Sequence, residues 1–185
     1  QIGGWVTIMK MALVIPLAGY FADKIDRVRI FQTTIFLATI HHISYWGWIH
    51  FFAPNNIPSI PAIMTFDVIG SFINVTGCIA LGPLLFDYVP RDRMGTVFAG
   101  MSFVRGMIKI VLMNGVGVFV TMYSKIFMGT NAAGEQIYDY SSGFLYTTLL
   151  GALGCLACFY FSAQKRKGAI IEYGRLELEN EKSAA

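Results

Sequence analysis

One stretch of the chain, TVFAGMSFVRGMIKIVLMNGVGVFVTMY, covers residues 96–123 and is apolar over almost its whole length. A helix needs about 20 mostly apolar residues to cross a hydrocarbon core of roughly 30 Å. This stretch exceeds that length and carries only two charged side chains, Arg105 and Lys109, one helical turn apart. It therefore predicts a membrane-spanning helix that holds two positive charges on one face.

Other parts of the chain have the same apolar character. The further predicted spans are residues 2–21, 30–52, 60–87 and 142–163. Strands would leave backbone groups unpaired in lipid, and these runs lack the alternation of a membrane barrel. The sequence therefore predicts an all-α fold, a polytopic membrane helical bundle with five transmembrane helices.

The composition of the chain agrees with this fold. Of its 185 residues 55% are hydrophobic and only 14% are charged, against about 25% charged in soluble domains. The net charge of +3 is small and no basic-aromatic motif is present, so we expect no nucleic-acid partner. The three cysteines all fall in apolar runs and are interpreted as packing residues. We expect a membrane portion over residues 1–168, a cytoplasmic polar tail over 169–185, and no cofactor, metal site or catalytic residue.

The basic residues alternate between the connectors. Connectors 22–29, 89–95 and 164–168 carry three, two and three lysines or arginines, whereas 53–61 carries none and 124–142 carries one. Positive residues gather on the cytoplasmic side of membrane proteins. This pattern predicts an integral protein of a cell membrane (inner or plasma membrane) whose C-terminus is cytoplasmic.

The first basic connector, GYFADKIDRVR (residues 19–29), carries a recognisable motif. It resembles the signature loop G-x-x-x-D-[RK]-x-G-[RK]-x-[RK] of the major facilitator superfamily (MFS), found between the second and third helices of each six-helix half. The matching residues are Gly19, Asp23, Lys24, Arg27 and Arg29. Asp26 stands where the family has its second glycine, which puts the tight turn there in question. In the family this loop is a cytoplasmic latch that stabilises the outward-facing state.

A second connector strengthens the resemblance. The sequence DYVPRDRMGTVFAG (residues 87–100) is similar to the V-P-x-x-x-R-G loop between the fourth and fifth helices of a half, with Met94 inserted before Gly95. Its charged residues Asp87, Arg91 and Arg93 form the second predicted cytoplasmic loop. The order of the two loops implies helices 8 to 12 of a twelve-helix transporter, because helices 2 to 6 would lead into a long central loop. The chain opens directly on apolar residues, so we expect the N-terminal half of the same transporter as its partner, together with the lipid bilayer.

Several polar side chains lie inside the predicted spans, where a charge costs about 2.5–3.5 kcal/mol on insertion scales. The resemblance implies that the first, third and fourth spans line the translocation path. The candidate path residues are Arg105, Lys109, Lys10, Asp67, Ser71 and Asn74. Asp67, Ser71 and Asn74 form one stripe by their spacing of four and three residues. Lys109 could instead reach the outer interface, and Asp67 could be a structural partner of a basic residue.

The resemblance implies a secondary active transporter, a symporter or antiporter that moves a small solute by alternating access with a proton or other cation. The solute would be an organic anion if Arg105 and the two lysines bind it. It would be a neutral metabolite such as a sugar if they pair with carboxylates of the absent half. The alternatives are a non-transporting receptor or scaffold of this fold, and an intramembrane enzyme. His41 and Asp67 are the sole catalytic candidates for an enzyme, and we interpret His41 and His42 as neutral histidines bonded within the bundle.

Overall fold

The described part of the chain is built of helices. The computed structural model describes residues 12, 15–53, 58–131 and 133–173. The elements are α2 (Ile15–Lys24), α3 (Arg27–Phe51), α4 (Ile60–Tyr88), the short 3-10 helix η3 (Arg91–Arg93), α5 (Met94–Phe127) and α6 (Ser142–Arg166). Within these residues the structure has no strand, and extended pairing is limited to an isolated bridge between Thr130 and Gln136. The predicted all-α fold is confirmed.

Three of the predicted spans are confirmed as well. Among the described residues, three helical segments are long and apolar enough to cross a membrane: Ile60–Tyr88, Arg91–Phe127 and Ser142–Arg166. They cover the predicted spans 60–87, 96–123 and 142–163. The protein is therefore an integral membrane protein.

The second predicted span, 30–52, is helical but more polar than a simple membrane span. Helix α3 has 25 residues, as many as α6, yet it is not among the three segments that are apolar enough. Gln32, His41 and His42 interrupt its apolar run and lower its mean hydropathy. Its length fits a membrane crossing, and its polar residues must find partners inside the bundle.

The first predicted span, 2–21, lies mostly outside the described residues. Its described end is α2, which continues to Lys24, three residues beyond the predicted boundary. The predicted connector 22–29 is correspondingly too long, because α3 already begins at Arg27.

Asp26 explains this short turn. Its side chain caps α3 by accepting hydrogen bonds from the backbone N–H of Val28 (2.8 Å) and of Arg29 (3.3 Å). Carboxylates are favoured at this position because they satisfy the free N–H groups of the first helical turn. The backbone φ of Asp26 is −50°, so the turn does not need the glycine found in the resembling family.

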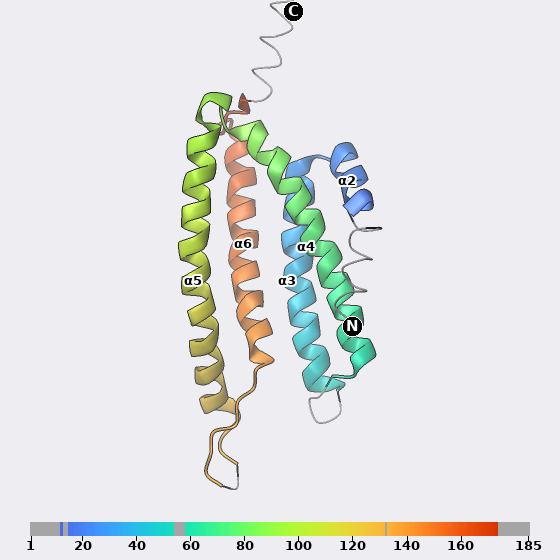
Figure 1. Cartoon of the computed structure of the whole chain (residues 1–185), viewed down its shortest axis with the longest axis vertical. Coiled ribbons are helices and arrows are strands. Elements are labelled where there is room, and N and C mark those ends of the chain that lie inside the picture. The colour runs from blue at the N-terminus through green and yellow to red at the C-terminus, as the bar shows by residue number, and fades with distance from the viewer. Residues whose placement is uncertain (1–11, 13–14, 54–57, 132, 174–185) are drawn as a thin grey trace, which may run out of the picture.

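Helix α3 lies at the centre of the bundle. It packs against α4 on one side and against α6 on the other, α2 packs mainly on α4, and α5 packs on α6 (Figure 1). The helices run alternately up and down, so the basic connectors gather at one end, which we call the basic end. The last residues of α3 and α5 and the first residues of α4 and α6 lie at the other end, the loop end.

Polar side chains of α3 sit on glycines of its neighbours. A Cβ atom added at Gly70 of α4 would lie 2.8 Å from the His41 ring, and one at Gly77 would lie 3.0 Å from the Thr34 hydroxyl. A Cβ at Gly151 of α6 would clash with Thr39. Small residues let membrane helices approach closely, and here they make room for the polar groups of the central helix.

Candidate functional site

A cavity of about 750 Å³ lies between α3 and α4, with Phe144 of α6 at its edge. Its volume falls within the range of about 300–1,000 Å³ typical of small-molecule sites. Because α3 supplies one wall and α4 the other, the cavity runs along the interface that the glycines of α4 create. It is therefore the candidate functional site of the described chain.

The α4 wall contains the predicted polar stripe. Asp67, Ser71 and Asn74 all line the cavity. Asp67 lies seven residues after the start of α4 at Ile60, about 10 Å along the helix axis. Ser71 is buried, whereas Asp67 and Asn74 are exposed, and the Cys78 thiol, also on this wall, donates to Asn74 Oδ1 over 3.8 Å. The structure thus brings these three predicted residues to one surface.

The α3 wall presents two histidines whose ring nitrogens bond to backbone carbonyls. His41 Nε2 lies 2.8 Å from the Phe66 carbonyl oxygen, and His42 Nδ1 lies 2.6 Å from that of Ala38. A carbonyl oxygen only accepts, so each of these nitrogens carries a hydrogen and donates it. His41 Nδ1 is buried and without a hydrogen-bond partner among the described residues. Both histidines are thus hydrogen-bonded within the bundle.

Three aromatic rings line the cavity together with Asp67. Tyr45 stacks on Phe66 with ring centroids 4.4 Å apart and planes 12° apart, and it lies 4.6 Å from the ring of Phe144. Phe66 directly precedes Asp67, so a carboxylate and three aromatic rings belong to one region. All four residues line the cavity.

The predicted basic path residues do not line this cavity. Arg105 and Lys109 lie on α5, in a run of residues 101–110 that are all exposed. Neither makes a hydrogen bond or ion pair with the described residues. Lys10 lies outside the described residues. Among the residues that line the cavity, Asp67 is therefore the sole member of the group aspartate, glutamate, lysine and arginine.

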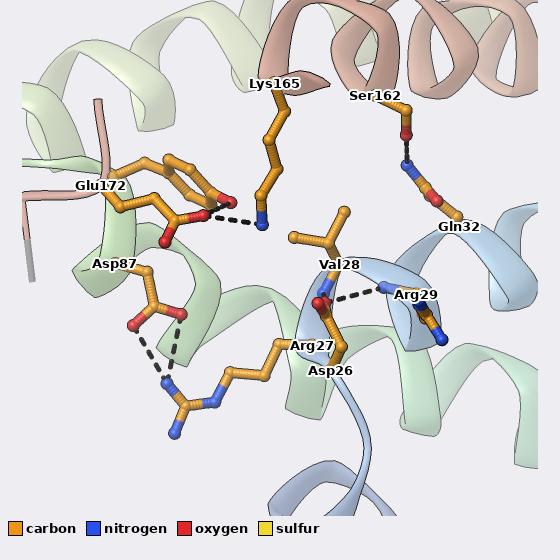
Figure 2. A network of polar contacts seen from close by, with 10 residues as sticks. Asp26, Arg27, Val28, Arg29, Gln32, Asp87, Ser162, Lys165 and Glu172 are labelled. Atoms are coloured by element: carbon orange, nitrogen blue, oxygen red, sulfur yellow. Dashed lines mark hydrogen bonds and ion pairs between the residues drawn. The ribbon is translucent and has the colours of Figure 1, made fainter. Parts of the chain in front are cut away.

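The two predicted loops meet at the basic end through an ion pair. Arg27 Nη1 lies 3.1 Å from Asp87 Oδ1 and 3.2 Å from Oδ2 (Figure 2). Arg27 comes from the first motif and Asp87 from the second, 60 residues later. Both side chains are 40% exposed, and exposed pairs of this kind contribute about 0–1 kcal/mol. This is the contact in which the two resembling loops come together.

The other predicted residues of the two basic loops make few contacts with the bundle. Lys24 Nζ lies 4.5 Å from the ring centroid of Tyr20, and Arg93 lies 3.8 Å from its neighbour Asp92. Arg29 and Arg91 are exposed. Gly19 and Asp23 lie in α2. A Cβ at Gly19 would meet no described atom within 4 Å.

Three further polar contacts, at the two ends of the bundle, were not predicted from the sequence. At the basic end, Glu172 accepts from Lys165 Nζ (2.7 Å) and from the Tyr88 hydroxyl (3.2 Å), which ties the start of the predicted tail to α4 and α6 (Figure 2). At the loop end, His50 Nε2 lies 3.2 Å from Asp139 Oδ2, with only 16% and 9% of the two side chains exposed. The partners lie 84 and 89 residues apart for Tyr88–Glu172 and His50–Asp139, and no periodicity links them.

Within the described residues, no three histidine, cysteine or acidic side chains gather where they could hold a metal ion. Comparisons with protein-family models, with curated proteins and with solved structures give no match to this chain.

Proposed function

We propose that the chain is part of a secondary active transporter that moves a small solute by alternating access through the α3–α4 cavity. The observation that carries this proposal is the cavity itself, which exposes Asp67 and Asn74 on a helix apolar enough to span a membrane. An ionisable side chain at such a position is expensive and usually serves a substrate or ion path. The resemblance of both basic loops to MFS loops supports the same proposal. We further propose that transport is coupled to the movement of a proton or another cation.

The Arg27–Asp87 pair fits the role of a contact that forms and breaks during transport. Alternating access requires the basic end to close in one state and to open in another. A contact worth only about 0–1 kcal/mol can break without a large barrier, because both side chains remain partly hydrated. Its partners lie at the ends of α3 and α4, the two helices that line the cavity.

The enzyme alternative has less support. A catalytic histidine needs a ring nitrogen that can reach a substrate. In His41, Nε2 is bonded to the backbone of Phe66 and Nδ1 is buried. The two residues that could form a catalytic pair, His41 and Asp67, therefore share a cavity in which neither ring nitrogen of His41 is available to a substrate.

Alternating access can be tested without knowing the substrate, because the cavity contains a natural reporter. Cys78 lines the cavity and is exposed. In a variant with Cys155→Ala and Cys158→Ala, reconstituted in liposomes, a membrane-impermeant thiol reagent added on either side should modify Cys78. A disulfide between Arg27→Cys and Asp87→Cys should abolish labelling from the basic end and preserve labelling from the loop end.

Two results would contradict the proposal. Labelling of Cys78 from one side only, unchanged by the engineered disulfide, would indicate a fixed receptor or scaffold. Failure of the reagent to reach Cys78 from either side would show that the cavity is not part of an aqueous path. The control is the same double-cysteine variant after reduction and removal of the reductant. Modification is assigned to Cys78 by peptide mass analysis, because the two engineered thiols also react once reduced, and labelling of Cys78 from the basic end should return.

A further inference from the structure

We infer that the α3–α4 cavity binds a small organic cation, an ammonium group beside Asp67 attached to an apolar body. This inference rests on the proposed transport function, and it names the class of solute. It differs from the anion suggested by Arg105, Lys109 and Lys10, of which the first two lie outside the cavity and the third lies outside the described residues.

The charge of the cavity carries the first step. Asp67 is acidic, and neither lysine nor arginine lines the cavity among the described residues. In surroundings that are less polar than water, a single carboxylate attracts a cation and repels an anion more strongly than it would in bulk solvent. An anionic solute would lose its hydration here without meeting a compensating positive charge.

The hydrogen-bonding groups carry the second step. His41 and His42 each donate a ring hydrogen to a backbone carbonyl, and the Thr34 hydroxyl donates to the Phe31 carbonyl oxygen (2.8 Å). These three lining residues therefore use those hydrogens on the protein. The Tyr45 and Ser71 hydroxyls and the Asn74 amide also line the cavity, but each can both donate and accept and so does not select the sign of a bound charge. The Asp67 carboxylate remains as a pure acceptor. An ammonium group, which only donates, matches this acceptor.

The aromatic rings carry the third step. Phe66 is adjacent to Asp67 in the chain, and Tyr45 lies between Phe66 and Phe144 in contact with both rings. The faces of aromatic rings attract cations, and more so where water is excluded. The rings also provide the apolar surface that an organic body would cover, which a bare metal ion would leave unused.

The experiment compares three probes that share a phenyl ring and a four-carbon chain. These are 4-phenylbutylammonium, 4-phenylbutan-1-ol and 4-phenylbutanoate, which are positive, neutral and negative near pH 7. The protein with Cys155→Ala and Cys158→Ala is held in nanodiscs of zwitterionic phosphatidylcholine. The readout is the rate at which a neutral maleimide modifies Cys78, which reports on occupancy of this cavity.

The ammonium probe should slow the modification of Cys78 at concentrations about tenfold lower than the alcohol, and the carboxylate should not protect. Asp67→Asn should raise the half-protecting concentration of the ammonium about tenfold and leave that of the alcohol unchanged. Asp67→Glu, which keeps the charge, should retain most of the preference. Asp92→Asn is the matched control, because Asp92 is exposed and lies outside the cavity.

Equal protection by all three probes, no protection by any of them, or stronger protection by the carboxylate would overturn the inference. Unchanged ammonium protection in a folded Asp67→Asn protein would overturn it as well. If Asp67→Asn fails to fold, the probe series on the parent protein and on Asp67→Glu still tests whether the cavity prefers a cation. If the cation preference is lost but Cys78 is still labelled from both sides, the transport proposal stands and only the cation inference fails. If Cys78 is labelled from one side but the cation preference remains, only the transport proposal fails.

Discussion

Helices α3 and α5 differ in a way that hydropathy alone does not suggest. Helix α5 belongs to a segment apolar enough to span a membrane, yet its residues 101–110 are all exposed and it packs mainly on α6. Helix α3 is too polar to be recognised as a span, yet it lies between α4 and α6. In a bilayer the apolar face can contact lipid, whereas polar groups need protein partners. In this bundle the more polar helix, α3, is the central one.

The glycines show how this central position is achieved. Glycines on α4 and α6 lie directly against His41, Thr34 and Thr39 of α3. On α5, a Cβ at Gly100, Gly106 or Gly117 would meet no described atom within 4 Å. The same residue type is therefore a close-packing site around α3 and an open surface position along most of α5.

The largest effect should come from filling the space beneath His41. Gly70→Ala places a Cβ against the His41 ring, and overpacking of this kind costs about 1–3 kcal/mol. In contrast, Gly106→Ala on α5 should be neutral or stabilising by up to about 1 kcal/mol, because alanine favours helix more than glycine does. Both can be measured as free energies of unfolding in detergent. The loss should largely disappear when Gly70→Ala is made in a His41→Ala background, and an undiminished loss there would exclude the clash.

A somewhat smaller effect is expected at the loop end of α3. Asp139→Asn removes the negative charge that faces His50 but can still accept hydrogen bonds from Ser141. Since both side chains are largely buried, the loss should be about 1–2 kcal/mol. The measurement is the melting temperature of Asp139→Asn, compared with that of Glu135→Gln. Glu135 is an exposed acid in the same connector. Equal melting temperatures for the two variants would mean that the His50–Asp139 contact does not stabilise the bundle.

The basic end of α3 should respond more weakly. Arg27→Gln and Asp87→Asn should each cost about 0–1 kcal/mol, because the pair is partly exposed. A double-mutant cycle measures the coupling, which should decrease at high salt. A coupling above about 2 kcal/mol would contradict the view of this pair as an easily broken contact.

The smallest effect should be found on α5. Arg105→Gln and Lys109→Gln should change the free energy of unfolding by less than about 0.5 kcal/mol, since both side chains are exposed and neither has a hydrogen-bond or ion-pair partner among the described residues. The test is unfolding of each variant beside the parent protein in the same detergent. A loss comparable to that of Asp139→Asn would show that these charges are already paired within the chain, and α5 would then resemble α3.

Much of the fold follows from local patterns in the sequence. The apolar runs around α4, α5 and α6 predict these helices because the hydrocarbon core imposes a minimum length. The stripe of Asp67, Ser71 and Asn74 was predicted correctly as one surface, since helical spacing alone determines which residues share a face.

The rest depends on how the helices are placed in space. The spacing of Arg105 and Lys109 puts them on one face but does not say which way that face points. The partners in Arg27–Asp87 and His50–Asp139 are too distant in sequence to be paired by any local rule. The central position of α3 could have been suspected from its histidines and threonines, because polar groups in lipid require partners.

Asp26 has a consequence for how the protein enters the membrane. Arg27 and Arg29 occupy the first turn of α3, where the helix dipole is positive and cations are disfavoured by about 0.3–1 kcal/mol each. The same two arginines are among the residues that predict a cytoplasmic start for this helix. The cap formed by Asp26 places a negative charge at the positive pole of the dipole. It thereby offsets the repulsion and allows an orientation signal to stand at the end of a helix that would otherwise be destabilised by it.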